Sequence, residues 1–354
     1  MVSGQWSVVS GRATTSTMLV PMVGGTCSER RRGALVVVLL PLVLAACFAS
    51  SGSTVRSRHD VSSFYAESPP TSAAPGLLLR TEPLTSSTGT PIEVAGAHAL
   101  RLLYVTRGPT GRATTSGAMA FIPNSPHPAT GRPVVAWAHP TRSPLNVAPS
   151  SSDHPLEGME PWLSSMLERG FLVVATDYSG LGTPGNERYL DGATEARDLV
   201  DSVLAVRQVP SAHASSRWVA WGASYGGHAA LWTASRARRL APQLHLRGVA
   251  VAAPVAELVQ LEHAQGQAWA AKEAKKDPPA TRGVPILVVQ GTRDEVVPLS
   301  DTELLRSSWC AAGADLALVL LPGATHGSVV PTASPIVVEW IAKRFEGARS
   351  VNTC

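Results

Sequence analysis

Hydrophobic and polar positions follow two different spacings along most of the chain. Two runs of strand type, residues 99–108 and 114–124, are joined by the turn-rich stretch GPTGRA, and this arrangement predicts a β-hairpin. The next apolar run, RPVVAWAH at 132–139, is almost unbroken, as expected for a strand buried on both faces. We therefore expect the fold to open with a hairpin followed by a fully buried strand.

After the hairpin, strand-like apolar runs alternate with segments whose apolar residues recur at helical spacing. The predicted strands are residues 132–139, 171–177, 217–222, 246–254, 284–291 and 316–323. The predicted helices are residues 160–170, 192–208, 225–237, 301–313 and 334–346. This alternation predicts a single α/β domain, with a mainly parallel sheet covered by helices on both faces.

The N-terminal region has a different character. Residues 1–46 contain three consecutive arginines, Arg30 to Arg32, and then an apolar run that is short and broken by Pro41. This pattern is typical of a secretory signal peptide, and a buried core helix is the alternative. Residues 47–80 are rich in serine and proline and predict a tether, so the folded domain is expected to span 81–354.

Composition and charge narrow the class of protein. Hydrophobic residues make up 44% of the 354 residues and charged residues 16%, which predicts a globular chain with a substantial core. The net charge is +4, but the first 46 residues carry four arginines against one glutamate, so the remainder is nearly neutral. We therefore expect no nucleic-acid partner.

The cysteines give two further predictions. LAAC at 44–47 resembles the lipobox of bacterial lipoproteins, which would make Cys47 a lipidated first residue and the only link to a membrane; ordinary cleavage after Ala49 is the alternative. Export would leave Cys310 and Cys354 in the mature domain, and we expect them to form a disulfide rather than remain free thiols. Two cysteines do not make a metal site.

The sequence GASYG places Ser224 between Gly222 and Gly226, where a predicted strand becomes a helix. That setting is typical of a nucleophile elbow, in which a strained turn presents a serine hydroxyl at the edge of the sheet. Glycines are expected on both sides because a Cβ atom there would collide with neighbouring backbone. A merely flexible turn is the alternative.

A serine nucleophile needs a base and an acid, and on this architecture they follow it in the order acid, then histidine. Asp294 lies just beyond the predicted strand that ends at Gln290, and His326 just beyond the one that ends at Leu321. We therefore predict that His326 takes the proton from Ser224 and that Asp294 orients the imidazole. Glu295 as the acid and His326 as an incidental loop histidine are the alternatives.

The backbone amide of Tyr225 is a candidate oxyanion donor. A second donor is expected from the loop after residues 132–139, but Pro140 has no amide hydrogen, so Thr141 is the next candidate. His139 and Tyr178 are candidates for lining the substrate pocket; a buried histidine at a strand end is the alternative for His139.

With these motifs the chain resembles the secretory lipases of the α/β-hydrolase superfamily, which are known from yeasts and actinobacteria. The resemblance runs from about residue 95 to the C-terminus. It rests on PVVAWAH, GFLVVATDYSGLGTPG, YLDGATEARDLVDSVLAVRQVP, WGASYGGHAALWTA, ILVVQGTRDEVVP and LLPGATHG. The resemblance implies an α/β-hydrolase fold, hydrolysis of carboxylic esters, commonly acylglycerols, and a triad of Ser224, Asp294 and His326, with no cofactor or metal. A disulfide that closes the chain end also fits the family.

Two departures from the family matter, one for the oxyanion hole and one for the expected substrate. Pro140 stands where members have glycine, and a cap of only about thirty residues, at 255–283, replaces a large helical one. A short cap cannot enclose long acyl chains, so we expect short-chain or soluble esters. An acyltransferase that uses the same triad, and a catalytically impaired binding protein, are the alternatives.

Overall fold

The computed structural model describes residues 63–86, 89–142, 155–257 and 277–354. The predicted leader at 1–46, the lipidation candidate Cys47 and the central part of the predicted cap lie outside the described residues.

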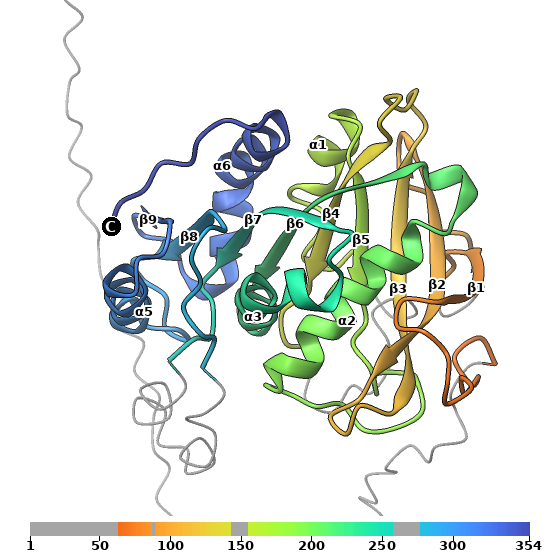
Figure 1. Ribbon diagram of the computed structural model, residues 1–354. Coiled ribbons are helices and arrows are strands. Elements are labelled where there is room, and N and C mark those ends of the chain that lie inside the picture. Colours follow the sequence, from red (N-terminus) through yellow and green to blue (C-terminus); the bar gives the residue numbers. More distant parts are fainter. Residues whose placement is uncertain (1–62, 87–88, 143–154, 258–276) are drawn as a thin grey trace, which may run out of the picture. The chain divides into compact units, whose positions relative to one another are not determined.

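A mixed sheet forms the centre of the domain (Figure 1). In the described part of the chain it has nine strands in the order β1-β2-β3-β5-β4-β6-β7-β8-β9. The strands are β1 (Leu78–Pro83), β2 (Ala97–Arg107), β3 (Ala113–Pro123), β4 (Arg132–Ala138), β5 (Leu172–Thr176), β6 (Ala214–Ala223), β7 (His245–Ala252), β8 (Ile286–Gly291) and β9 (Leu316–Leu321). The first three strands and the β3–β5 pair are antiparallel, whereas all pairs from β5 to β9 are parallel. The predicted hairpin and the mainly parallel sheet are confirmed.

Helices cover both faces of this sheet. They are α1 (Leu163–Glu168), α2 (Gly192–Val206), the short 3-10 helix η2 (Pro210–Ala212), α3 (Tyr225–Leu240), α5 (Leu299–Ala311) and α6 (His326–Glu346). Figure 1 shows α1 and α6 on one side of the sheet and α2 and α3 on the other. None of the helices described here is both long and apolar enough to cross a membrane.

The core is richest in large side chains around the middle strands. Trp137 of β4 and Trp221 of β6 are fully buried, and their rings lie 5.3 Å apart. Trp162, at the start of α1, packs against Trp137 with ring centroids 4.9 Å apart. Every residue of β4 and β5 is buried, so these two strands hold the loops that follow them in fixed positions.

Ordered packing begins before the predicted boundary at residue 81. The rings of Phe64 and Tyr65 are buried and pack on Leu103 of β2. The guanidinium of Arg101 lies 5.5 Å from the centre of the Phe64 ring and 5.6 Å from that of Tyr65. The apolar and cationic contacts of this pair explain why part of the predicted tether belongs to the folded unit.

The last helix also begins earlier than expected, at His326 instead of Ser334. Pro331 and Pro335 lie inside this helix, and each proline removes a backbone hydrogen bond, which disfavours a helix in the residues before it. A capping box at the first turn offsets the lost hydrogen bonds, because the Thr325 amide donates to the Ser328 hydroxyl at 2.8 Å. The early start places His326 at the N-terminal end of the helix.

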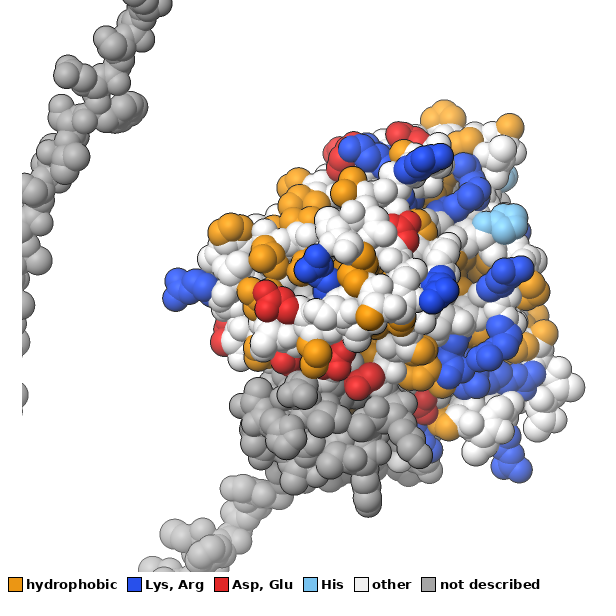
Figure 2. Space-filling model, turned by 60° about the vertical axis from the view of Figure 1, so that its left-hand side comes forward, with side chains coloured by type: hydrophobic (Ala, Val, Ile, Leu, Met, Phe, Trp, Pro, Cys, Tyr) orange, Lys and Arg blue, Asp and Glu red, His pale blue; other side chains and the backbone are white. Residues whose placement is uncertain are grey.

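The C-terminal segment lies along the edge strand β9, on the edge of the domain that is turned toward the viewer in Figure 2. The amide of Thr353 donates to the carbonyl of Leu316 at 2.9 Å, and the amide of Leu318 donates to the Thr353 hydroxyl at 3.1 Å. A disulfide joins Cys310 of α5 to Cys354, with the Cα atoms 5.2 Å apart. The two cysteines are 44 residues apart in the sequence, and their disulfide holds the C-terminal segment against the domain.

Candidate active site

Ser224 occupies a sharp corner between β6 and α3. Its φ of 53° and ψ of −119° lie in a region that residues with a side chain rarely adopt. Its amide donates to the carbonyl of Ala252 at 2.9 Å, so the neighbouring strand β7 anchors the corner. A strained backbone at a strand-to-helix junction is the geometry of a nucleophile elbow.

The flanking glycines are required by close backbone contacts. A Cβ atom at Gly226 would collide with the carbonyl oxygens of Ala138 and His139, at the end of β4. A Cβ atom at Gly222 would collide with the carbonyl of Gly226 itself. The glycines therefore let α3 approach β4 closely, as expected from the sequence, and do not merely loosen the turn.

The structure brings Ser224, Asp294 and His326 together. The hydroxyl oxygen of Ser224 lies 3.0 Å from Nε2 of His326. Nδ1 of His326 lies 2.9 Å from one carboxylate oxygen of Asp294 and 3.1 Å from the other. Because the carboxylate accepts, Nδ1 carries the imidazole proton and Nε2 is free to accept the proton of the serine.

Asp294 is held in place as an ionised group. Burial by itself would raise its pKa, but hydrogen bonds from His326 and from the amides of Val297 and Val296 keep the pKa of Asp294 below its usual value. The two amides donate to Oδ1 at 2.8 and 3.0 Å. A carboxylate with these partners accepts from the imidazole throughout the neutral range.

The loops that carry the acid and the histidine are tied together. The amide of Arg293 donates to the carbonyl of Ala324 at 3.0 Å, and the amide of Gly323 donates to the Thr292 hydroxyl at 2.9 Å. Both loops follow neighbouring parallel strands, β8 and β9. The distance between the acid and the histidine is thus fixed at the carboxyl ends of these two strands. In open α/β sheets, ligands bind at this end of the strands.

The two candidate oxyanion donors follow adjacent strands, β6 and β4. Tyr225 is the first residue of α3, so its amide has no acceptor within the helix. Thr141 lies on the loop after β4, which is the neighbour of β6. A hydrogen bond of 2.8 Å joins the hydroxyl oxygens of Thr141 and Tyr189, a residue that the sequence analysis did not single out.

Tyr178, a predicted pocket residue, contacts the residue that follows β4 and the first residue of α3. Its side chain is buried, with φ at +63°, and its hydroxyl donates to the carbonyl of His139 at 3.2 Å. Its ring meets that of Tyr225 edge to face, with centroids 5.1 Å apart. Tyr178 therefore holds the end of β4 close to the start of α3.

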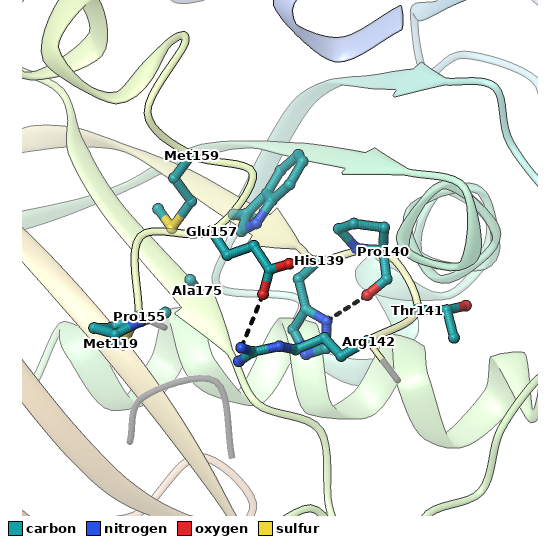
Figure 3. Close-up of a pocket in the computed structure, with 10 residues that line it drawn as sticks. Met119, His139, Pro140, Thr141, Arg142, Pro155, Glu157, Met159 and Ala175 are labelled. Carbon is teal, nitrogen blue, oxygen red and sulfur yellow. Dashed lines mark hydrogen bonds and ion pairs between the residues drawn. The ribbon is translucent and has the colours of Figure 1, made fainter. Parts of the chain in front are cut away.

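A small pocket lies beside the candidate oxyanion loop (Figure 3). Apolar side chains from β3, β4 and β5 form much of its wall, and an ion pair of 2.9 Å between Arg142 and Glu157 lies across it. The lining residues are Met119, Trp137, His139, Pro140, Thr141, Arg142, Pro155, Glu157, Met159 and Ala175. Among the described residues, the predicted pocket residue His139 lines it, whereas Ser224, Asp294 and His326 do not.

His139 is neutral in this pocket. Burial lowers the pKa of its imidazole to about 4, and Nδ1 lies 2.8 Å from the carbonyl oxygen of Pro140, to which it donates. The ring also lies 4.7 Å from that of Tyr178. It forms part of the pocket wall without a charge.

A buried polar chain under the elbow was missed by sequence reasoning. Nδ1 of His228 lies 2.8 Å from Glu195 of α2, and the indole of Trp232 donates to Nε2 of His228 at 3.1 Å. Because Nε2 accepts, Nδ1 carries the proton and donates to the carboxylate. The signal in the sequence was a histidine four residues after Ser224, on the buried face of the helix that the serine opens.

Comparison with known sequences identifies a family and several curated relatives. The family model described as "Secretory lipase" matches residues 158–275 and 271–353. Lipase 4 of Candida albicans is 33% identical over 73 residues, which are 20% of this chain and 16% of that protein. The secreted triacylglycerol lipase LIP4 of Malassezia globosa is 32% identical over 80 residues, which are 22% of this chain and 18% of that protein. The matches thus span less than a fifth of these curated relatives.

Comparison with solved structures covers more of the chain. Candida antarctica lipase A in its closed state superposes with a TM-score of 0.65 and 17% identity, over 83% of this chain and 88% of that one. The rice cell wall degrading esterase LipA from Xanthomonas oryzae superposes with a TM-score of 0.62 and 18% identity, over 78% of this chain and all of that one. At these identities the likeness establishes the fold, which is the predicted α/β-hydrolase fold.

The two family segments together run from residue 158 to residue 353 and cover more than half of the chain. They include the elbow and the loops of Asp294 and His326. The fold is the α/β-hydrolase fold that the family resemblance implied, and the serine corner is the one that the GASYG motif predicted. The chain belongs to the secretory lipase family.

Proposed function

We propose that the protein is a serine carboxylic ester hydrolase that works through an acyl-enzyme. One observation carries the proposal: the Ser224 hydroxyl is 3.0 Å from an imidazole whose other nitrogen is 2.9 Å from a buried carboxylate. A serine hydroxyl is a weak nucleophile alone, and this arrangement is what activates it.

The chemistry follows from the proton positions. Nε2 of His326 takes the proton as Ser224 attacks the ester carbonyl, and the amides of Tyr225 and Thr141 donate to the oxyanion. The imidazolium then protonates the departing alcohol, which leaves the acyl group on the serine. A water molecule, deprotonated by the same nitrogen, releases the carboxylic acid and restores the free hydroxyl.

The Ser224→Ala variant tests this function. We expect it to lose at least about 10³-fold of the turnover of p-nitrophenyl acetate, since removal of the nucleophile leaves only binding and oxyanion effects. A fluorophosphonate probe should label the wild-type protein and not the variant. Unchanged turnover in Ser224→Ala, or a wild-type protein that does not react with the probe, would reject the proposal; the second result would indicate a binding protein.

For the substrate we propose short-chain or soluble esters. Only about thirty residues separate β7 from β8, where the cap would have to cover a long acyl chain. Comparing kcat/KM for p-nitrophenyl acetate, octanoate and palmitate tests this, and a maximum at palmitate would overturn it. Product analysis with an added alcohol separates hydrolysis from acyl transfer.

We also propose that the protein is exported and is anchored to the cell membrane through a lipid on Cys47. The arginine-flanked apolar run and the LAAC sequence support this, as does the description of the family as secretory. Cys47→Ser should release the protein from the membrane fraction of expressing cells. Equal fractionation of both forms would contradict the anchor.

A further inference from the structure

Tyr189 touches residues on both sides of the candidate oxyanion hole. It lies on the connection between β5 and α2 and is 42% exposed. Its ring stacks on that of Tyr225, with centroids 4.6 Å apart and planes inclined by 20°. Its hydroxyl makes the 2.8 Å hydrogen bond with Thr141. One side chain therefore links the residue after Ser224 to the loop that follows β4.

The loop after β4 needs such a link. Pro140 cannot donate a backbone hydrogen, so the donor has to come from residue 141, one position farther from the strand. The side chain of Thr141 is exposed, and packing alone does not fix it. Its hydrogen bond with Tyr189 supplies the constraint.

The platform under Tyr189 is rigid. The ring of Tyr225 is buried and meets the buried ring of Tyr178, whose hydroxyl is bonded to the carbonyl of His139. Partial burial raises the pKa of Tyr189, so its hydroxyl stays protonated and can donate to Thr141 at neutral and mildly alkaline pH. Three tyrosines thus run from the elbow to the end of β4.

We propose that Tyr189 is a positioning residue that fixes the two halves of the oxyanion hole relative to each other, through its ring on Tyr225 and its hydroxyl on Thr141. The inference rests on the proposed ester hydrolase function. Tyr189 acts through these two residues and not on the substrate itself.

The test is the Tyr189→Phe variant, which keeps the stacked ring and removes the hydroxyl. We expect kcat for p-nitrophenyl acetate to fall roughly 10-fold, with KM within about twofold, because a donor displaced by a fraction of an ångström acts mainly in the transition state. Inhibition by a trifluoromethyl ketone, which forms a tetrahedral adduct, should weaken in proportion to kcat/KM. Thr141→Val should give a similar loss, and the double variant should be no slower than the slower single variant.

Tyr104→Phe is the matched control. It removes a buried tyrosine hydroxyl that bonds with Thr176 at 2.7 Å and donates to the carbonyl of Asp198 at 2.8 Å, outside the candidate site. We expect Tyr104→Phe to lower the melting temperature and leave kcat within about twofold. Tyr189→Phe should lower kcat and leave the melting temperature nearly unchanged.

The outcomes separate the two proposals. If the wild-type protein cleaves esters and Tyr189→Phe keeps its kcat and its inhibitor affinity, the positioning role is wrong and the hydrolase function stands. Additive losses in the double variant would likewise overturn the pairing of Tyr189 with Thr141. If the wild-type protein reacts with neither ester nor fluorophosphonate, both proposals fail.

Discussion

Single residues at the candidate site differ sharply in what surrounds them, and Asp294 with its neighbour Glu295 is the clearest case. Asp294 is buried against His326 and two backbone amides, whereas Glu295 is exposed. The sequence alone left both as candidates for the acid. Geometry separates them, because only Asp294 has its carboxylate within hydrogen-bond distance of the imidazole among the described contacts.

Asp294→Asn should leave the fold intact and lower kcat for p-nitrophenyl acetate by about 10⁴-fold, since an amide can stabilise the wrong imidazole tautomer and cannot balance the imidazolium charge. Glu295→Gln is the matched control, adjacent in sequence and expected to keep full activity. Steady-state kinetics of the two variants decide the assignment, and a large loss in Glu295→Gln would transfer the role to that residue.

At the scale of elements, the sequence predicted best where burial is uniform. The strands β4, β5 and β8 are buried along their whole length, so their apolar runs are unambiguous. The edge strand β1 was missed because LLRTEP is half polar and gains its order from pairing with β2. The stacking of Tyr189 on Tyr225 could not be predicted for another reason: it joins a loop residue to the first residue of α3, and no local sequence pattern relates the two.

The disulfide is an element-scale constraint that experiment can isolate. The double variant Cys310→Ala/Cys354→Ala should lower the free energy of unfolding, by up to about 4 kcal/mol from the loop-entropy relation for a 44-residue separation. Urea unfolding measures the change. Dithiothreitol should produce the same loss in the wild-type protein and none in the double variant; a wild-type midpoint that ignores the reductant would contradict the prediction.

For the molecule as a whole, buried acids on α2 make stability depend on pH. Burial raises the pKa of Asp201 to about 8 and that of Asp198 to about 6, although Arg197 and Arg107 act against the shift at Asp201. A carboxyl whose pKa is higher in the folded state than in the unfolded state binds protons more tightly when folded. Its stabilising effect is complete below about pH 4 and is lost as pH rises to about 8.

Asp201→Asn should therefore reduce the fall in melting temperature between pH 5 and pH 8, because the amide cannot ionise in the interior. The variant should match the wild-type protein below about pH 4 and exceed it by a growing margin up to about pH 8. Asp191→Asn is the control on the same helix, a half-buried N-cap whose replacement still accepts from Thr194. Thermal melts across this range check the slope, and parallel curves for wild type and Asp201→Asn would refute the linkage.

The C-terminal segment along β9 also gives the protein a dependence on its redox surroundings. The outermost strand of an open sheet offers free amide and carbonyl groups that can recruit strands from other copies. Thr353 occupies some of these groups, and Cys354 is tethered next to it. Without the disulfide only hydrogen bonds hold this segment on β9, so we expect reduction of Cys310–Cys354 to expose the edge strand and to favour pairing with other copies of the chain.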